Sequence, residues 1–343
     1  MKNLSKRCLL FFLLCNLYYV GFSQECTIGF FQVSQKHIST AAKIGAQIIH
    51  HYHFEGWKNG KYQTGKNNEA LNYLDLAQKH NLKVLMGFDR YSLINNNIQH
   101  IKERIDSLKN HPALAYWYLA DEPDVNFLSR QRCQYYYELI RQFDPFHPVV
   151  ITISSNSPKL AGYDDAADII IVDSYPIRND YAIEKMGNVK YRINLAKKIQ
   201  EEKNISKPIF AAIQSFEKNY GDVPYRYPNL LETKYMAFSA LFEGAKGVFF
   251  YSLDLSTAEH IEEVLKPAIE NLDIFNNYDR LQISYKTDSP MAFIKKGEFN
   301  YYILANYLSE PVFRHISIIE SLPPVEIYLK SFEFKTITIR ELN

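Results

Sequence analysis

The strongest constraint on the fold is the order in which β-rich runs and helical segments follow one another after residue 26. Short apolar runs alternate with segments whose apolar residues recur every three or four positions, most clearly from Ile98 to Leu108. The β runs are expected at 28–33, 47–54, 83–88, 115–120, 149–153, 169–172, 209–213 and 248–251. Helices are expected at 36–45, 69–80, 98–108, 127–143, 191–203, 232–245 and 260–275.

Eight β runs separated mostly by helices predict an α/β fold, a (β/α)8 TIM barrel over residues 24–278. A doubly wound open sheet is the alternative, but no glycine-rich phosphate loop follows any run, which disfavours its nucleotide-binding versions. After Tyr278 the pattern changes to strand-like runs separated by turn residues. We therefore expect a small all-β domain at 279–343.

Residues 1–23 are typical of a secretory signal peptide. Three basic residues lie within the first seven positions, an apolar core runs from Leu9 to Leu14, and the small residues Gly21 and Ser23 allow cleavage. A membrane anchor is the alternative, but Asn16 interrupts the apolar run well short of the roughly 20 residues that a span needs. We expect a secreted or periplasmic protein with no membrane span after cleavage.

The formal net charge is only +1, so a nucleic-acid partner is not expected. Two of the 4 cysteines lie in the signal segment, which leaves Cys26 and Cys133. These two could pair in an oxidising compartment, but lone cysteines are more often buried as small apolar side chains.

Polar side chains gather where the predicted strands end, which is where the chemistry of a TIM barrel lies. Eight of these residues are predicted to bind substrate or to catalyse: His53, Asp89, Asp121, Glu122, Asp173, Tyr175, Gln214 and Tyr251. Acids, amides and phenols together suit a polyhydroxylated ligand, which needs many hydrogen-bond partners and aromatic surface.

The fourth strand carries the most specific pattern, Trp117-Tyr-Leu-Ala-Asp-Glu-Pro123. Two adjacent carboxylates directly after an apolar strand are hard to explain by structure alone. Capping of a helix that opens near Val125 would account for Asp121 or Asp124, but it would not require Glu122.

This segment resembles the fourth-strand signature of the retaining glycoside hydrolases of clan A, in which Asn-Glu-Pro carries the acid/base. The resemblance implies Glu122 as acid/base and Tyr175 as the tyrosine near the reacting sugar. Clan A enzymes place a nucleophilic Glu after the seventh strand, where this chain has Gln214. Glu217 is the remaining candidate, although three residues span about 10 Å of extended chain.

The adjacent Asp-Glu pair is also similar to barrel hexosaminidases of glycoside hydrolase families 20 and 123. In those families the 2-acetamido oxygen of the substrate attacks the anomeric carbon, so no enzyme nucleophile is needed. The similarity implies that Asp121 orients the acetamide and that Glu122 protonates the leaving oxygen. Gln214 is compatible with this mechanism.

Two other functions remain open at this point. His51-Tyr52-His53 would project two imidazoles to one face of a strand, as in metal-dependent hydrolases, but further zinc ligands are not evident. A carbohydrate-binding barrel without catalysis would also explain Gln214. We predict a glycoside hydrolase acting on an oligo- or polysaccharide, with no cofactor and no metal; the sequence does not indicate an oligomeric state.

Overall fold

A computed structural model describes residues 26–58, 61–62, 66–123, 125–126, 128–154, 162–179, 186–220, 222–276, 280–284, 291–308, 310–316, 325–330 and 333–340. The expected signal peptide lies outside the described residues. Among those residues, no helix is long and apolar enough to span a lipid bilayer.

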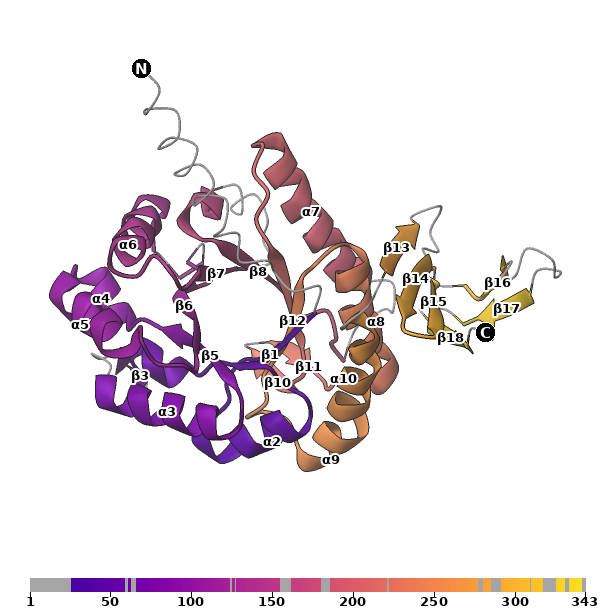
Figure 1. The fold of residues 1–343 in the computed structure, drawn as a ribbon, viewed down its shortest axis with the longest axis horizontal. Helices are drawn as coiled ribbons and strands as arrows, with labels where there is room; N and C mark the ends of the chain where they lie inside the picture. The colour runs from indigo at the N-terminus through magenta and orange to yellow at the C-terminus, as the bar shows by residue number, and fades with distance from the viewer. Residues whose placement is uncertain are drawn as a thin grey trace, which may run out of the picture.

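Eight parallel strands form a closed barrel, which confirms the predicted fold class (Figure 1). Around the barrel the order is β1, β12, β9, β8, β7, β6, β5 and β2. Their bounds are β1 (Thr27–Phe30), β2 (Ile48–Ile49), β5 (Lys83–Gly87), β6 (Leu114–Asp121), β7 (Val149–Ile153), β8 (Ile169–Ser174), β9 (Ile209–Gln214) and β12 (Gly247–Tyr251). Each strand is close to its expected position except β2, which is much shorter.

Helices surround the barrel and cover its outer face, as Figure 1 shows. The main helices are α2 (Ile38–Lys43), α3 (Asn67–Lys79), α4 (Arg90–Ile94), α5 (Ile98–Leu108), α6 (Arg130–Phe143), α7 (Asn188–Glu202) and α8 (Leu230–Phe242). After β12 the chain forms α9 (Ala258–His260), a π-helical turn η6 (Ile261–Leu265), α10 (Lys266–Leu272) and a 3-10 turn η7 (Asp273–Phe275). Smaller elements include η1 (Gln35–His37), η4 (Asp164–Ala166) and the ribbons β3 (Trp57–Lys58) with β4 (Lys61–Tyr62) and β10 (Lys218–Tyr220) with β11 (Val223–Tyr225).

The barrel interior is packed with side chains and is not a channel. Its inner cluster comprises Phe31, Ile48, Leu85, Tyr118, Val150, Ile169, Ile171, Phe210, Ala212 and Phe249. Gly29 makes room for one of these rings, because a Cβ there would lie 2.3 Å from Cε1 of Phe249. Strands that are buried on both faces need continuous apolar runs, and the sequence contains such runs at these strands.

The second strand ends earlier than the sequence indicates. After β2 the chain turns into a 3-10 helix, η2 (Tyr52–Glu55), in which the His51 side chain accepts a hydrogen bond from the backbone N–H of His53. Gly56 ends this helix in the left-handed conformation, at φ 82°. The prediction that His51 and His53 lie on one face of a strand is therefore wrong.

Helix α6 also differs from expectation. It begins at Arg130 and is capped by Ser129, whose side chain accepts from the N–H of Arg132, so no helix opens at Val125. Asp124 lies outside the described residues. Capping of a helix therefore does not explain Asp121.

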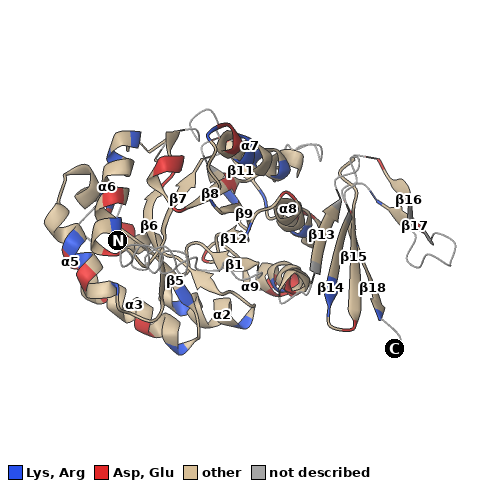
Figure 2. Ribbon diagram, turned by 45° about the horizontal axis from the view of Figure 1, so that its top comes forward, with Lys and Arg blue, Asp and Glu red and all other residues tan. Residues whose placement is uncertain are grey.

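The C-terminal strands form an antiparallel sheet in the order β13 (Arg280–Ser284), β14 (Met291–Lys296), β15 (Phe299–Ala305) and β18 (Phe334–Arg340). A hairpin of β16 (Val312–Ile316) and β17 (Val325–Leu329) extends from it. Helix α8 lies between the barrel and this sheet (Figure 2). Phe334 of the sheet packs against Phe238 and Phe242 of α8, with ring centroids 5.2 and 5.4 Å apart. The sheet and the barrel thus share one hydrophobic core.

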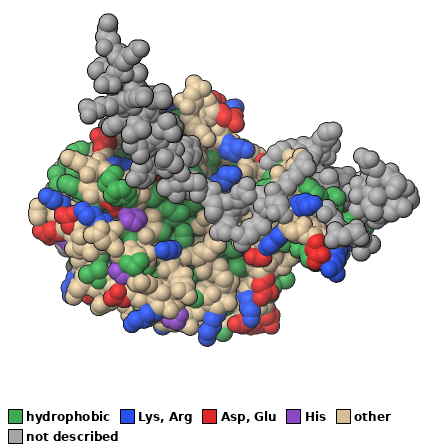
Figure 3. Space-filling view, in the orientation of Figure 1, with side chains coloured by type: hydrophobic (Ala, Val, Ile, Leu, Met, Phe, Trp, Pro, Cys, Tyr) green, Lys and Arg blue, Asp and Glu red, His purple; other side chains and the backbone are tan. Residues whose placement is uncertain are grey.

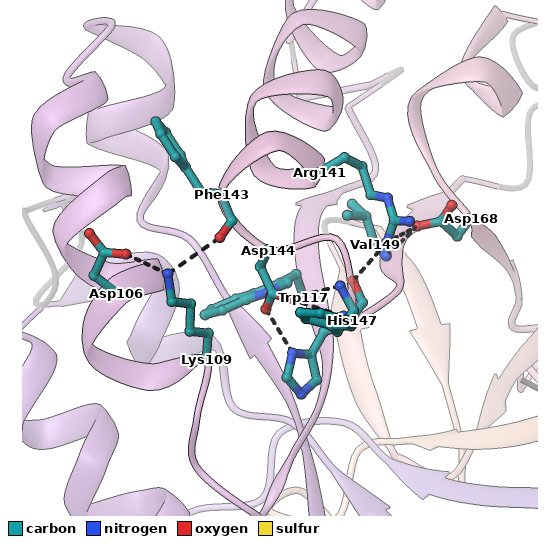
Figure 4. Close-up of polar contacts among 10 residues, drawn as sticks. Asp106, Lys109, Trp117, Arg141, Phe143, Asp144, His147, Val149 and Asp168 are labelled. Carbon is teal, nitrogen blue, oxygen red and sulfur yellow. Dashed lines mark hydrogen bonds and ion pairs between the residues drawn. The ribbon is translucent and has the colours of Figure 1, made fainter. Parts of the chain in front are cut away.

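A polar cluster stabilises the N-terminal end of the barrel (Figure 4). Asp144 accepts hydrogen bonds from Nε1 of Trp117 at 2.8 Å and from Nδ1 of His147 at 2.7 Å, while its own side chain is almost fully buried. Burial raises the pKa of Asp144, but the hydrogen bonds from Trp117 and His147 outweigh it and hold the pKa below its usual value. Contacts at this end of the barrel contribute to stability, because the active sites of such barrels lie at the other end.

Cys26 and Cys133 are both buried free thiols, not a disulfide. Burial raises the pKa of each to about 12, so neither is a reactive thiolate. On the face shown in Figure 3, basic and acidic side chains are interspersed, in keeping with the small net charge.

Candidate active site

A cavity of about 290 Å³ opens at the C-terminal ends of the barrel strands. Its lining residues come from loops that follow six different strands, and they mix apolar, aromatic and charged side chains. They are Gln32, Tyr52, Glu55, Phe88, Arg90, Leu93, Leu119, Ala120, Asp121, Pro123, Asn126, Leu128, Lys218 and Tyr251. Apolar walls with a few convergent polar groups are typical of a small-molecule site.

Asp121 reaches this cavity from the last position of β6. The register between β6 and β7 shifts between Tyr118 and Ala120, which changes the direction in which the end of the strand points. Oδ1 of Asp121 accepts hydrogen bonds from the hydroxyl of Tyr118 at 2.7 Å and of Tyr52 at 3.4 Å. Donors of this kind favour the ionised form of a carboxylate.

Glu122 follows in a conformation that side chains rarely adopt, with φ at +41°. Its N–H donates to the carbonyl of Thr152 at 2.9 Å, and its carbonyl accepts from the N–H of Asn126 at 2.8 Å. These bonds fix the backbone on both sides of the residue. Backbone held in a sparsely populated region by surrounding contacts is often found at functional sites.

The carboxyl group of Glu122 forms a hydrogen bond with that of Asp173, which lies near the end of β8 and is 6% exposed. The Tyr175 hydroxyl donates to Oδ2 of Asp173 at 3.0 Å. Burial, followed by the charges of Glu122 and Asp121, raises the pKa of Asp173 well above its usual value. Two carboxyl groups in such contact cannot both ionise readily, so the pair retains a proton.

Aromatic rings form one wall of the site. Tyr251 of β12 stands between Tyr175 and Tyr52, with ring centroids 5.5 and 6.1 Å away. Burial raises the pKa of both Tyr52 and Tyr175 well above 10, so their hydroxyls remain donors at neutral pH. The site therefore brings together five of the predicted positions: Asp121 and Tyr251 line the cavity, and Glu122, Asp173 and Tyr175 lie beside them without being among its lining residues.

Gln214 lies at the end of β9 but does not face the cavity. Its side chain is 0% exposed, and Oε1 accepts from the N–H of Ile177 at 2.9 Å. Nε2 donates to the carbonyls of Ile177, Phe216 and Arg226. These contacts use both ends of the amide to hold the loops after β8 and β9, which leaves no polar atom for a sugar.

The side chains of Asp89 and His53 form their contacts outside the cavity. Asp89 caps α4 by accepting from the N–H of Ser92 at 2.8 Å, and its other oxygen lies 3.0 Å from Nε2 of His100. His53 lies in a separate depression of the surface, where Nε2 is 2.8 Å from Glu69. Neither residue lines the cavity.

Glu217 is exposed at the end of the short loop between β9 and β10, directly before Lys218. It is not among the residues that line the cavity, although its neighbour Lys218 is. Within the described part of the chain, no group of three or more His, Cys, Asp or Glu side chains is arranged to hold a metal ion.

The sequence analysis assigned no role to Glu55, Arg90 or Lys218, three charged residues that line the cavity. Glu55 is the last residue of η2, and its Oε1 lies 2.8 Å from Nε2 of His50. Gly56 is the sequence signal that could have indicated it. A glycine often ends a helical turn in the left-handed conformation, so it suggests that the strand has already ended before Glu55.

Comparison with known proteins agrees with the geometry. Residues 66–234 match the family described as "Glycosyl hydrolases family 2, TIM barrel domain". No curated protein matches the sequence. Over these residues the chain is similar to the TIM-barrel domain of that family, and the closed eight-stranded barrel agrees with the match.

Solved glycosidase structures share the fold at low sequence identity. A family 39 glycoside hydrolase from the gut symbiont Bacteroides cellulosilyticus WH2 has a TM-score of 0.58 and 13% identity, over 92% of this chain and 81% of that one. An endo-beta-1,4-mannanase from Thermotoga petrophila has a TM-score of 0.53 and 11% identity, over 94% and 99%.

A beta-galactosidase from the psychrophilic Marinomonas ef1 has a TM-score of 0.55 and 10% identity, over 72% of this chain. The chain spans 60% of the length of that beta-galactosidase. At these identities the likeness concerns the fold alone.

Proposed function

We propose that the protein is a secreted glycoside hydrolase in which Glu122 donates a proton to the glycosidic oxygen of an oligo- or polysaccharide. The observation that carries this proposal is the hydrogen bond between the carboxyl groups of Glu122 and Asp173 at the mouth of the barrel. A general acid must hold a proton near neutral pH, and a pair of contacting carboxyl groups supplies one.

The proposed reaction begins when the proton of Glu122 moves to the glycosidic oxygen as the bond to the anomeric carbon breaks. The end of β9 offers an amide, Gln214, that is bonded to three backbone carbonyls and cannot form a glycosyl ester. We therefore favour attack by the 2-acetamido oxygen of the substrate. Water then opens the cyclic intermediate and returns a proton to Glu122.

Asp121 is the proposed partner of the acetamide. It lines the cavity and its Oδ1 accepts from two tyrosine hydroxyls. An ionised carboxylate there would accept a hydrogen bond from the acetamide N–H and would stabilise the positive charge that develops on the cyclic intermediate. Tyr175 and Tyr251 would provide the aromatic surface beside the sugar ring.

A carbohydrate-binding barrel without catalysis is the second candidate, and Gln214 favours it. Turnover of 4-nitrophenyl glycosides with and without a 2-acetamido group separates the candidates. Release of 4-nitrophenol only from the 2-acetamido substrates is the expected result. Binding of glycans without turnover of any substrate would favour the second candidate.

Secretion is part of the proposal and rests on the composition of residues 1–23. Its test is the N-terminal mass of the protein produced in a secreting host. A mature chain that begins near Gln24 is expected, and a chain that retains Met1 in the cell would contradict it.

A further inference from the structure

We infer that Glu55 is a specificity-determining residue, a hydrogen-bond acceptor for one hydroxyl group of the bound sugar. The inference deepens the proposed function, on which it rests for the identity of the ligand as a sugar. It concerns a residue that the sequence pattern did not indicate, and it follows from how Glu55 and His50 are enclosed.

Contacts with Arg104 and the space at Gly87 fix the position of Glu55. The buried guanidinium of Arg104 donates from Nη2 to the carbonyl of Phe54 at 3.2 Å and from Nε to that of Gly87 at 2.8 Å. It thereby joins η2 to β5. Gly87 leaves the space that the side chain fills, because a Cβ at this position would lie 2.7 Å from Cγ of Glu55.

The Glu55 side chain contacts the imidazole of His50 and also lines the cavity. Nε2 of His50 lies 2.8 Å from Oε1, and the Glu55 side chain is 12% exposed while that of His50 is 0% exposed. The imidazole is enclosed by the rings of Tyr52 and Tyr118, with centroids 4.7 and 4.8 Å away. Among the described residues, neither ring nitrogen of His50 nor Oε1 of Glu55 has a hydrogen-bond partner, so their 2.8 Å contact is close but poorly aligned for a hydrogen bond.

The protonation state of this pair follows from its burial. Burial lowers the pKa of His50 well below 6.5, assisted by the charge of His51. Burial also raises the pKa of Glu55 well above 4.5, and the charge of Asp121 adds to that effect while Arg90 and Arg104 oppose it. Both directions favour the uncharged form of each group, a neutral imidazole beside a neutral carboxyl group.

A protonated carboxyl group has two different oxygens. One of them, Oε1, lies 2.8 Å from Nε2 of His50, and Oε2 remains as an acceptor. Since Glu55 lines the cavity, that acceptor is available to a donor in the ligand. Hydroxyl groups of a sugar are such donors, and Asp121 in the same cavity offers a second acceptor.

This arrangement makes an unusual prediction about substitutions. Glu55→Gln keeps a polar group beside His50 and an acceptor for the sugar, because the amide nitrogen can lie against the imidazole while the amide oxygen accepts from the sugar. Glu55→Leu keeps the approximate size and removes both. The glutamine variant should bind sugar within twofold of the wild type, and the leucine variant about fivefold to tenfold more weakly.

The experiment measures binding by titration calorimetry, so it does not depend on catalysis. The probes are methyl β-D-glucopyranoside, methyl β-D-galactopyranoside, methyl β-D-mannopyranoside and methyl 2-acetamido-2-deoxy-β-D-glucopyranoside. Glu69→Gln and Glu69→Leu are the matched controls, because Glu69 forms the same 2.8 Å contact with a histidine outside the cavity. Both controls should bind like the wild type.

Deoxygenated probes keep the test valid if Glu55→Leu does not fold. The 3-, 4- and 6-deoxy analogues of the tightest probe are titrated against the wild type and Glu55→Gln. One deoxygenation should weaken both proteins fivefold to tenfold. Three outcomes would overturn the inference. The first is an equal loss of affinity in Glu55→Gln and Glu55→Leu. The others are no binding of any probe to the wild type, and no deoxygenation that weakens binding more than twofold. Expected binding without turnover of any aryl glycoside would overturn the proposed function alone.

Discussion

The carboxyl groups of Glu122 and Asp173 meet across the end of β7, although they belong to β6 and β8 and are 51 residues apart in the chain. The N–H of Glu122 donates to Thr152 on the intervening strand. The contact therefore depends on the order of three neighbouring strands, and a proton is held near Asp121, which lines the cavity.

Replacing Glu122 with Gln should lower turnover by roughly 10²- to 10⁴-fold, because an amide cannot donate a proton to the leaving oxygen. Initial rates with an activated and an unactivated aryl glycoside measure the effect. The loss should be larger for the substrate with the poorer leaving group. A variant within threefold of the wild type on both substrates would refute the role of Glu122.

Replacing Asp173 with Asn should change how stability depends on pH. The pKa of Asp173 is raised in the folded chain, so the unfolded chain loses its proton first as the pH rises above about 3.8. The free energy of unfolding of the wild type should then fall as the pH rises toward the raised pKa, and Asn removes this contribution. Melting temperatures between pH 4 and 8 should diverge in favour of the variant, whereas parallel curves would contradict the raised pKa.

Replacing Gln214 with Glu should destabilise the fold without creating a nucleophile. A carboxylate cannot donate to the carbonyls of Ile177, Phe216 and Arg226, and we expect a loss of about 3 kcal/mol in the free energy of unfolding. Urea denaturation measures it, with Gln78→Glu on the exposed face of α3 as control. Faster hydrolysis of substrates without an acetamido group would show instead that residue 214 reaches the anomeric carbon.

Replacing Glu217 with Ala should leave turnover within threefold of the wild type. The side chain is exposed beyond β9 and does not line the cavity. Rates with 2-acetamido substrates provide the measurement. A fall to the level of buffer alone would restore a mechanism with an enzyme nucleophile.

Replacing Asp144 with Asn should lower the free energy of unfolding by about 2–3 kcal/mol and leave substrate specificity unchanged. The carboxylate accepts from Trp117 and His147 at the far end of the barrel from the cavity. Because its pKa is lowered in the folded chain, its stabilising effect exists above the unfolded pKa and disappears as the pH falls. The difference between variant and wild type should therefore shrink on acidification.

The sequence predicted the barrel well because its main signal is local. Strands buried on both faces require runs such as those at β7 and β8, and these runs hardly depend on distant partners. The same logic placed Asp121, Glu122, Asp173, Tyr175 and Tyr251 at one end of the barrel. Their proposed roles remain predictions that the experiments above test.

The sequence could not show which polar side chains would form hydrogen bonds within the barrel and its loops instead of facing the cavity. Gln214 is bound by the backbone of Ile177 and Arg226, and Asp89 is bound by His100, all of which are distant in sequence or on other elements. Glu55 entered the cavity for a similar reason, since its position depends on the short β2 and on the space at Gly87. Such pairings arise only from the tertiary fold.

Phe334 has a consequence for how the protein can be handled. Its ring is 6% exposed and closes a group of aromatic side chains on α8, yet it lies on the last strand of the chain. A fragment trimmed to the eight-stranded barrel would present those rings to water and would tend to self-associate. Production of the enzyme should therefore retain the chain through Arg340, and proteolysis near the C-terminus should be monitored as a route to loss of solubility.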